Sequence, residues 1–181
     1  MITLYHLRRS RSERIAWLLE ELGIDYHLEC IDRVDGRYAP QSLKNVHPLG
    51  RAPAIRDGDL VLAESGAIVD YILARHGNGR FRIHYQETGF AEYLYWFHYA
   101  EASLMLQLLR ESSLVRIVPD VDRHAGMDKV RLTTREHLEF IGRIGIKMRW
   151  LKFISARSLA SSTPRPMVCE NNIERPRRAI I

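Results

Sequence analysis

A strand–helix–strand pattern in residues 2–31 constrains the fold of this chain more than any other feature. Residues 2–7, ITLYHL, form a short run of apolar and β-favouring residues that predicts a buried strand. Residues 26–31, YHLECI, alternate as a second strand does. A helix is predicted between them, and its apolar face consists of Ile15, Leu18, Leu19 and Leu22. Gly23 follows as the residue that ends this helix. Because strands joined by a helix pair in parallel, this pattern predicts an α/β fold with helices covering the sheet.

The next residues complete such a sheet. A short helical piece is expected near residues 40–46, followed by strands at Ala54–Arg56 and Leu60–Ala63 on either side of a DGD turn. A helix from Ser65 to His76 follows. The order β-α-β-α-β-β-α predicts a mixed four-stranded sheet.

The second half of the chain has a different pattern, because the strands stop near residue 86. Residues 86–112 form one long helical pattern, residues 113–127 are expected to form a loop, and residues 128–152 are helical again. An all-α domain therefore follows the α/β domain, with the boundary expected between residues 77 and 86.

The last residues, 153–181, contain a Ser/Thr cluster and three prolines but no sustained period, which predicts a poorly ordered tail. Residues 151–181 also carry six Lys and Arg against two Asp and Glu, so they hold most of the net charge of +5. A nucleic-acid-binding surface needs its basic residues on a folded face. The charge distribution therefore argues against a nucleic-acid partner.

Other bulk features favour a cytoplasmic protein. No apolar run approaches the roughly 20 residues of a membrane helix, and the first residues do not resemble a signal peptide. Cys30 and Cys169 are too few for a disulfide framework and too far apart for a CxxC centre. We expect no membrane partner and a reducing compartment.

Ser10 lies three residues before Glu13, at the start of the first helix. This spacing predicts an N-cap box, in which the Ser10 hydroxyl accepts the Glu13 amide. The same position follows the first strand, where open α/β sheets bind ligands and where a helix N-terminus favours an anion. The sequence leaves open whether Ser10 only caps the helix or also holds an anion.

Two further motifs can supply a binding groove. In HPLGRAPAI, Pro53 precedes a strand and is a candidate for a cis peptide bond, which would expose the Ala52 backbone to an extended peptide. In LAESGAI, Ser65 is expected to cap the following helix, and with Glu64 it can hold a carboxylate or an ammonium group. Together with Ser10, these groups suit a small peptide that carries a thiol.

These motifs resemble the glutathione S-transferase family, in its serine-type bacterial and fungal form. SRSER resembles the start of the family's first helix, HPLGRAPAI its proline loop, LAESGAIVDYI its γ-glutamyl-binding segment, and YWFHYAEASLM the first long helix of its second domain. The resemblance covers residues 1–150. It implies a thioredoxin-like glutathione-binding domain over 1–78 and a partial helical domain over 86–152.

The family pattern stops near residue 150, since the Ser/Thr-x-x-Asp cap box that begins the next family helix is missing. We therefore expect the helical domain to be truncated and 153–181 to be an atypical tail. Our hypothesis is a changed reading frame near residues 149–155 or a degenerate gene copy.

The resemblance also implies roles for individual residues. Ser10, with Ser12 as the alternative, stabilises the glutathione thiolate. The residues implied to hold the rest of glutathione are Arg51, Ala52, Pro53, Glu64 and Ser65. The candidates for the electrophile site are Tyr95, His98 and Tyr99, and no metal site is expected.

The implied function is a detoxifying glutathione transferase, a cytoplasmic homodimer that joins the glutathione thiolate to small hydrophobic electrophiles. Two alternatives stay open at this point. One is a glutathione-dependent disulfide reductase or peroxidase. The other is a non-catalytic protein, truncated or degenerate, that binds glutathione or docks to a partner.

Overall fold

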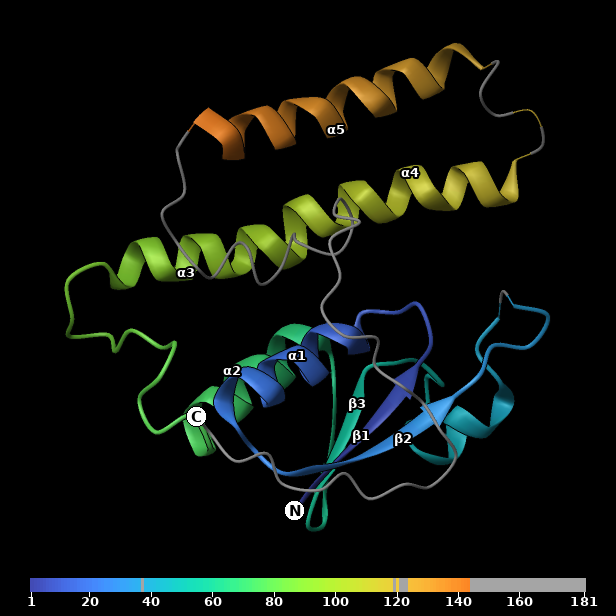
Figure 1. Ribbon diagram of the computed structural model, residues 1–181. Helices are drawn as coiled ribbons and strands as arrows, with labels where there is room; N and C mark the ends of the chain where they lie inside the picture. The colour runs from blue at the N-terminus through green and yellow to red at the C-terminus, as the bar shows by residue number, and fades with distance from the viewer. Residues whose placement is uncertain (37, 119, 121–123, 144–181) are drawn as a thin grey trace, which may run out of the picture. The chain divides into compact units, whose positions relative to one another are not determined.

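The structure of this chain is a computed structural model that describes residues 1–36, 38–118, 120 and 124–143 (Figure 1). The described residues divide into two units, one of residues 1–80 and one that begins at Phe81. Each unit buries apolar side chains of its own.

The first unit is built on strand β1 (Ile2–Leu7), which has a neighbour on each side in a sheet of order β2-β1-β3-β4. Strand β2 (Tyr26–Ile31) is parallel to β1, whereas β3 (Ala54–Asp57) is antiparallel to β1 and to β4 (Leu60–Ala63). All of β1 except Thr3 is buried, as expected for an inner apolar strand. The predicted mixed four-stranded sheet is confirmed.

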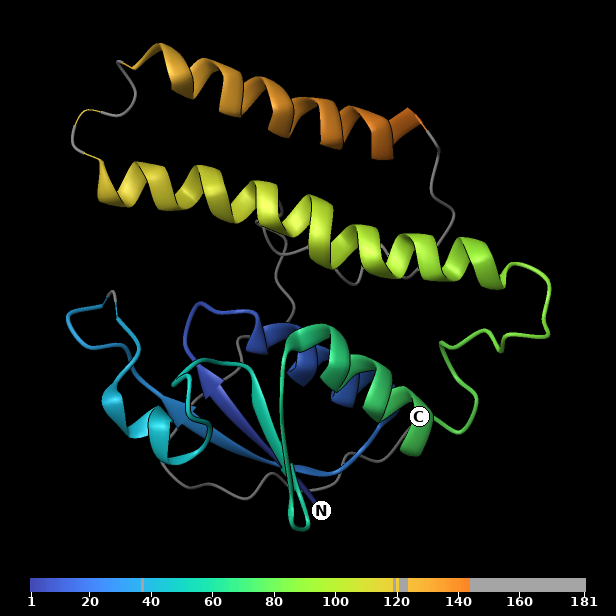
Figure 2. The ribbon, with the colours of Figure 1, turned by 180° about the vertical axis from the view of Figure 1, so that it is seen from behind.

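Helices α1 (Ser12–Leu22) and α2 (Ser65–Arg75) lie side by side over one face of the sheet (Figures 1 and 2). Gly23 ends α1 with a left-handed backbone, as the sequence predicted. The apolar side chains that the two helices bury completely or almost completely, at most 2% exposed, are Ile15, Ala16, Leu18, Leu19, Ile68, Ile72 and Leu73. The predicted helical piece near residues 40–46 is a 3₁₀ turn, η1 (Gln41–Asn45).

The strand registers bring several chain segments to one edge of the sheet. Leu7, the last residue of β1, pairs with Ile31, the last residue of β2. Because β3 runs the other way, its first residue, Ala54, pairs with Tyr5 near the same end of β1. Ala54 also pairs with Ala63, the last residue of β4. The segments that follow β1, β2 and β4, and the segment that precedes β3, therefore share one edge.

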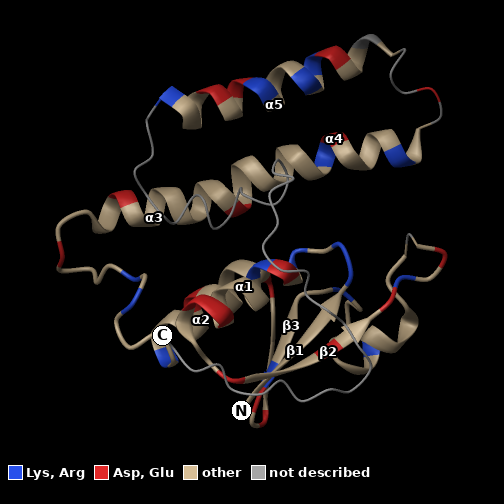
Figure 3. Cartoon of the chain, viewed as in Figure 1, with Lys and Arg blue, Asp and Glu red and all other residues tan. Residues whose placement is uncertain are grey.

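The second unit is helical. Helix α3 (Phe90–His98) continues through η2 (Tyr99–Leu104), a π-helical turn, into α4 (Met105–Ile117). Helix α5 (Ala125–Arg143) packs against α4. Lys, Arg, Asp and Glu are interspersed along α5 (Figure 3), so the described part of this helix presents no face of a single charge.

The loop expected over residues 113–127 is shorter than predicted, because α4 continues to Ile117 and α5 begins at Ala125. The Ser112 hydroxyl donates to the Leu109 carbonyl (3.1 Å) and so lies along α4 without ending it. The helix ends where Val118 turns extended, as a residue before a proline does. The start of the predicted helix 86–112 was also wrong, since residues 86–89 are turns and α3 begins at Phe90.

A buried polar network joins α4 to α5. Gln107 donates to the Val130 carbonyl (3.0 Å) and to the Thr134 hydroxyl (3.3 Å). The Thr134 hydroxyl lies 2.7 Å from a carboxylate oxygen of Glu111. Met127 and Val130 are also buried between the two helices, and the partly buried Leu114 and Val118 pack against them. Both polar and apolar contacts therefore fix α5 against α4.

The expected fold class, a thioredoxin-like α/β domain followed by helices, is confirmed. The domain limits inferred from the sequence stay a prediction, and the tail at 153–181 lies outside the described residues. No helix among the described residues is long and apolar enough to cross a membrane.

Asp57 links the end of β3 to the end of α2. It accepts hydrogen bonds from the Tyr71 hydroxyl (2.9 Å) and from His76 Nε2 (2.8 Å). These bonds, led by the one from His76, hold the pKa of Asp57 below its ordinary value of 3.8. The carboxylate is therefore stabilising only while it is ionised.

We predict that Asp57→Asn lowers the free energy of unfolding by about 1.5 kcal/mol at neutral pH, since hydrogen bonds to a charged group are lost. A group whose pKa is depressed by folding contributes above its unfolded pKa, and its contribution disappears as the pH falls through the folded value. Urea unfolding at several pH values should therefore show the difference between the two proteins shrinking below about pH 4. Asp59→Asn, at an exposed position in the adjoining turn, is the control, and an equal loss in both variants would contradict the prediction.

Candidate functional site

Ser10 lies in the loop between β1 and α1, at the edge of the sheet described above. The predicted N-cap box is wrong: α1 begins at Ser12, its N-cap is Arg11, and no side chain caps it. The Glu13 amide bonds to the backbone carbonyl of Ser10 (3.3 Å). The Ser10 hydroxyl instead accepts the amide of Ser12 (3.2 Å), because Ser10 lies two positions before the helix start and a serine there closes a local turn.

The second serine, Ser12, is completely buried, whereas Ser10 is half-buried. The two hydroxyl oxygens lie 2.6 Å apart. Ser12 Oγ is also 2.9 Å from Nδ1 of His6 and 3.2 Å from the carbonyl oxygen of Leu7. Ser10 is therefore the outer member of a hydrogen-bonded chain that begins inside the domain.

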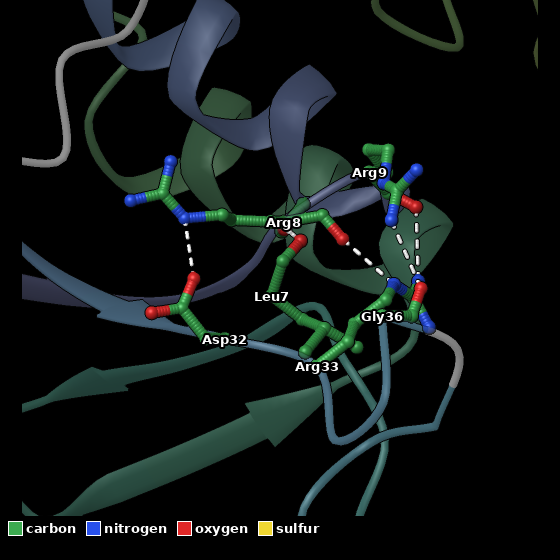
Figure 4. Close-up of polar contacts among 7 residues, drawn as sticks. Leu7, Arg8, Arg9, Asp32, Arg33 and Gly36 are labelled. Carbon is green, nitrogen blue, oxygen red and sulfur yellow. Dashed lines mark hydrogen bonds and ion pairs between the residues drawn. The ribbon is translucent and has the colours of Figure 1, made fainter.

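The segment after β2 holds the backbone of the Ser10 loop (Figure 4). The guanidinium of Arg33 donates from Nε to the carbonyl of Arg8 and from a terminal nitrogen to the carbonyl of Arg9, both at 2.9 Å. In return, Arg9 donates to the carbonyl of Gly36 (2.9 Å), and Arg8 forms an ion pair with Asp32. Arg33 thus spans two successive carbonyls directly before Ser10, which a planar fork of donors can do.

Arg9 has a left-handed backbone, with φ of 54°. A residue with a Cβ rarely takes this conformation unless neighbouring contacts hold it. The bonds from Arg33 and to Gly36 are such contacts, because they fix the carbonyl and the side chain of Arg9. The turn that presents Ser10 is therefore held in a defined position.

The proline loop reaches the same edge. The Ala52–Pro53 peptide bond is cis, as the sequence suggested. Pro53 is buried, Ala52 is half-buried and Arg51 is exposed. Ala54 follows as the first residue of β3, so the Ala52 backbone lies next to the paired strands.

Glu64 and Ser65 follow β4 at this edge. The cap predicted for Ser65 is wrong, because Glu64 is the N-cap residue of α2 and Ser65 is its first helical residue, 1% exposed. Glu64 is exposed and has a φ of 70°, an uncommon value for a residue other than glycine. The Ile68 amide donates to the Glu64 carbonyl (2.9 Å), so the backbone of Glu64 belongs to the helix start.

Comparison with known proteins agrees with this arrangement. Residues 1–74 match the family model described as "Glutathione S-transferase, N-terminal domain". Glutathione S-transferase 3 of Schizosaccharomyces pombe is 40% identical over 105 residues, which are 58% of this chain and 43% of the relative. Residues 1–74 therefore match the N-terminal domain of glutathione S-transferases, and the curated relatives that match the chain carry the same family name.

Other relatives in this family match over similar lengths. Glutathione S-transferase 1 of Saccharomyces cerevisiae is 32% identical over 124 residues, 65% of this chain and 53% of the relative. The chain thus spans about half the length of these curated glutathione S-transferases. A glutathione S-transferase structure from Actinobacillus pleuropneumoniae is 35% identical with a TM-score of 0.66 and covers 79% of this chain and 65% of that one.

A glutathione transferase from Phanerochaete chrysosporium, solved in complex with oxidized glutathione, has the same fold. It is 20% identical with a TM-score of 0.69, covering 83% of this chain and 70% of that one.

The residues predicted for the electrophile site lie in the second unit. Tyr95 is half-exposed, His98 is exposed, and Tyr99 is partly buried at the first position of the π-helical turn. The Tyr99 hydroxyl and Nδ1 of His137 are 2.7 Å apart, and burial raises the pKa of Tyr99. Within the described residues, no group of three His, Cys, Asp or Glu side chains could hold a metal ion.

Sequence reasoning did not single out His6 or Arg33. His6 had a usable signal, because a histidine inside an otherwise apolar buried strand needs a polar partner. Arg33 had none, since its two carbonyl acceptors lie 24 and 25 residues away along the chain.

We predict that Arg33→Lys lowers the free energy of unfolding by about 1 kcal/mol, because a single ammonium does not bind both carbonyls as the fork does. Urea unfolding measures this loss. Arg75→Lys, at an exposed position at the end of α2, is the matched control. If the two variants are equally stable, the paired bonds from Arg33 to the carbonyls of Arg8 and Arg9 contribute nothing to the free energy of unfolding.

Proposed function

We propose that this protein is a glutathione transferase that joins the glutathione thiolate to small hydrophobic electrophiles. The observation that carries the proposal is the gathering of Ser10, Ala52 and the Glu64–Ser65 pair at one edge of the sheet. The names of the curated relatives support the same activity.

Ser10 is the proposed catalytic residue, and its hydroxyl donates to the glutathione sulfur. A free thiol with a pKa of about 8.5 is only a few per cent thiolate at neutral pH. Lowering that pKa by two units requires about 2.7 kcal/mol of preferential thiolate stabilisation. A hydrogen bond to a charged group contributes about 1.5–3 kcal/mol and a helix N-terminus about 0.3–1 kcal/mol, so these two contributions suffice without a metal.

Ser10 is preferred to Ser12 because of its burial. Ser12 is 0% exposed and its hydroxyl already meets three polar atoms inside the domain. A ligand sulfur would have to displace one of these contacts. Ser10 is half-buried, so its hydroxyl can reach a ligand at the edge of the sheet while Ser12 keeps its contacts inside the domain.

The remaining groups of the edge match the rest of glutathione. The Ala52 backbone can pair with the cysteinyl unit as an added strand does. Glu64 and Ser65, at the N-terminus of α2, suit the charged amino and carboxylate groups of the γ-glutamyl end. The exposed guanidinium of Arg51 suits the glycine carboxylate.

The electrophile is proposed to meet Tyr95, His98 and Tyr99 of the helical unit. The protein is further proposed to act in the cytoplasm as a homodimer. In the reaction, the thiolate attacks an electrophilic carbon, a C–S bond forms, and the bond to the leaving group breaks. With chlorodinitrobenzene, the C–Cl bond breaks and chloride leaves.

We predict that the purified protein is retained on immobilised glutathione and forms the glutathione conjugate of chlorodinitrobenzene, followed by absorbance. Reduction of a disulfide or a peroxide without conjugation would favour the reductase or peroxidase instead. Binding without turnover of any of these substrates would favour a non-catalytic glutathione-binding protein, and absence of binding would refute the proposal.

We predict that Ser10→Ala raises the pKa of the bound glutathione thiol by about two units and lowers kcat at neutral pH by on the order of tenfold or more. The affinity for glutathione should change little, since Ala52 and Glu64 remain. Titration of the thiolate absorbance of bound glutathione measures the pKa. Ser10→Thr keeps the hydroxyl and should keep the pKa low, whereas an unchanged pKa in Ser10→Ala would exclude Ser10 as the thiolate donor.

A further inference from the structure

Three side chains of the first unit form a continuous hydrogen-bonded chain from the buried strand β1 to the edge of the sheet. His6 Nδ1 lies 2.9 Å from Ser12 Oγ, which lies 2.6 Å from Ser10 Oγ. His6 is 4% exposed and Ser12 is 0% exposed. Bulk water therefore does not supply the bonds of Ser12, and the protein itself decides where the proton of each hydroxyl points.

We propose that His6 directs the hydroxyl proton of Ser10 toward the glutathione sulfur, acting through Ser12. The inference rests on the proposed function of Ser10 and adds two positioning residues to it. Neither His6 nor Ser12 touches the ligand in this scheme.

The inference follows from counting protons around Ser12. Its hydroxyl has one proton and three polar neighbours: His6 Nδ1, Ser10 Oγ and the carbonyl oxygen of Leu7 at 3.2 Å. When Nδ1 of His6 carries a proton, it donates to Ser12 Oγ. The proton of Ser12 then has two acceptors, Ser10 Oγ at 2.6 Å and the Leu7 carbonyl oxygen at 3.2 Å, and the shorter contact favours donation to Ser10.

In that state the acceptor positions of Ser10 are filled. Its oxygen accepts both the Ser12 hydroxyl and the Ser12 amide at 3.2 Å. A hydroxyl oxygen has two acceptor lone pairs and one proton. The proton of Ser10 therefore points away from Ser12, toward the ligand.

The other tautomer of His6 gives the opposite result. With Nδ1 unprotonated, the Ser12 proton is donated to His6, and the 2.6 Å contact is then a hydrogen bond only if Ser10 donates to Ser12. The proton of Ser10 is used inside the domain, and a thiolate has to compete for it. His6 thus determines whether Ser10 is a donor at the edge of the sheet.

The first test measures the pKa of the bound glutathione thiol in His6→Leu. Without a donor at position 6, both lone pairs of Ser12 are open and its proton can go to the Leu7 carbonyl oxygen. Ser12 then accepts from Ser10, so the thiol pKa should rise by about one unit, the size of one neutral hydrogen bond. The KM for glutathione should change little while kcat falls severalfold. His6→Asn places an amide nitrogen where histidine has Nδ1 and should restore the low pKa.

The second test adds Ser12→Ala to His6→Leu. Removing the Ser12 hydroxyl removes the acceptor that competes for the Ser10 proton, so most of the rise in the thiol pKa should be reversed. A merely structural role for the two residues predicts the reverse, with the double variant at least as impaired as either single variant.

Ser10→Ala is the reference that separates failure of the inference from failure of the proposed function. If Ser10→Ala raises the thiol pKa and His6→Leu does not, His6 is no positioning residue and Ser10 keeps its role. If Ser10→Ala also leaves the pKa unchanged, the proposed role of Ser10 fails.

A measurement on the unliganded wild-type protein completes the test and needs neither glutathione nor a stable variant. Long-range proton–nitrogen NMR correlations distinguish the tautomers of a histidine ring. We expect the His6 ring to carry a proton on Nδ1. A neutral ring with its proton on Nε2 alone would overturn the inference.

Discussion

The antiparallel pairing of β1 with β3 is the constraint on which the rest of the first unit depends. The register that pairs Tyr5 with Ala54 puts the proline loop next to the end of β1. The pairing of Ala54 with Ala63 extends the same edge to the start of α2. A shift of one residue would turn buried Ile55 to the opposite face. Burial of the strand residues therefore holds the register, and the register holds the candidate ligand groups together.

Arg9 and Glu64, both at this edge, have backbone conformations that side chains disfavour. Arg9 and Glu64 both have positive φ, and such residues cost on the order of 1–3 kcal/mol each. Surrounding contacts must offset that cost, and for Arg9 they are the bonds of the Arg33 guanidinium and the Gly36 carbonyl. Conformations of this kind occur often at ligand sites, where side chains need directions that regular structure does not give.

The sequence predicted the elements of the first unit well, because their signals are local. The apolar run of β1, the stripe of α1 and Gly23 after it depend only on neighbouring residues. The two cap predictions failed because a cap depends on the residue at which the helix starts. Ser10 lies two residues before α1, and Ser65 already lies inside α2.

The contacts that fix the candidate site were beyond sequence reasoning for another reason. Arg33 meets the carbonyls of Arg8 and Arg9 only after β2 has paired with β1. His6 meets Ser12 only after α1 has packed on the sheet. Residue type and spacing predict which groups a site has, whereas these tertiary contacts set the direction in which the groups point.

The π-helical turn Tyr99–Leu104 has a consequence for the helix that follows it. A π-helical turn holds one residue more than the same stretch of regular α-helix. One residue corresponds to a rotation of about 100° about the helix axis. The apolar stripe of α3 therefore does not continue in phase into α4, where Met105 and Gln107 are buried. A helical wheel drawn for Phe90–Ile117 as one regular helix mixes two separate faces. A one-residue gap within this turn is therefore the natural way to align the chain with a relative whose helix is regular.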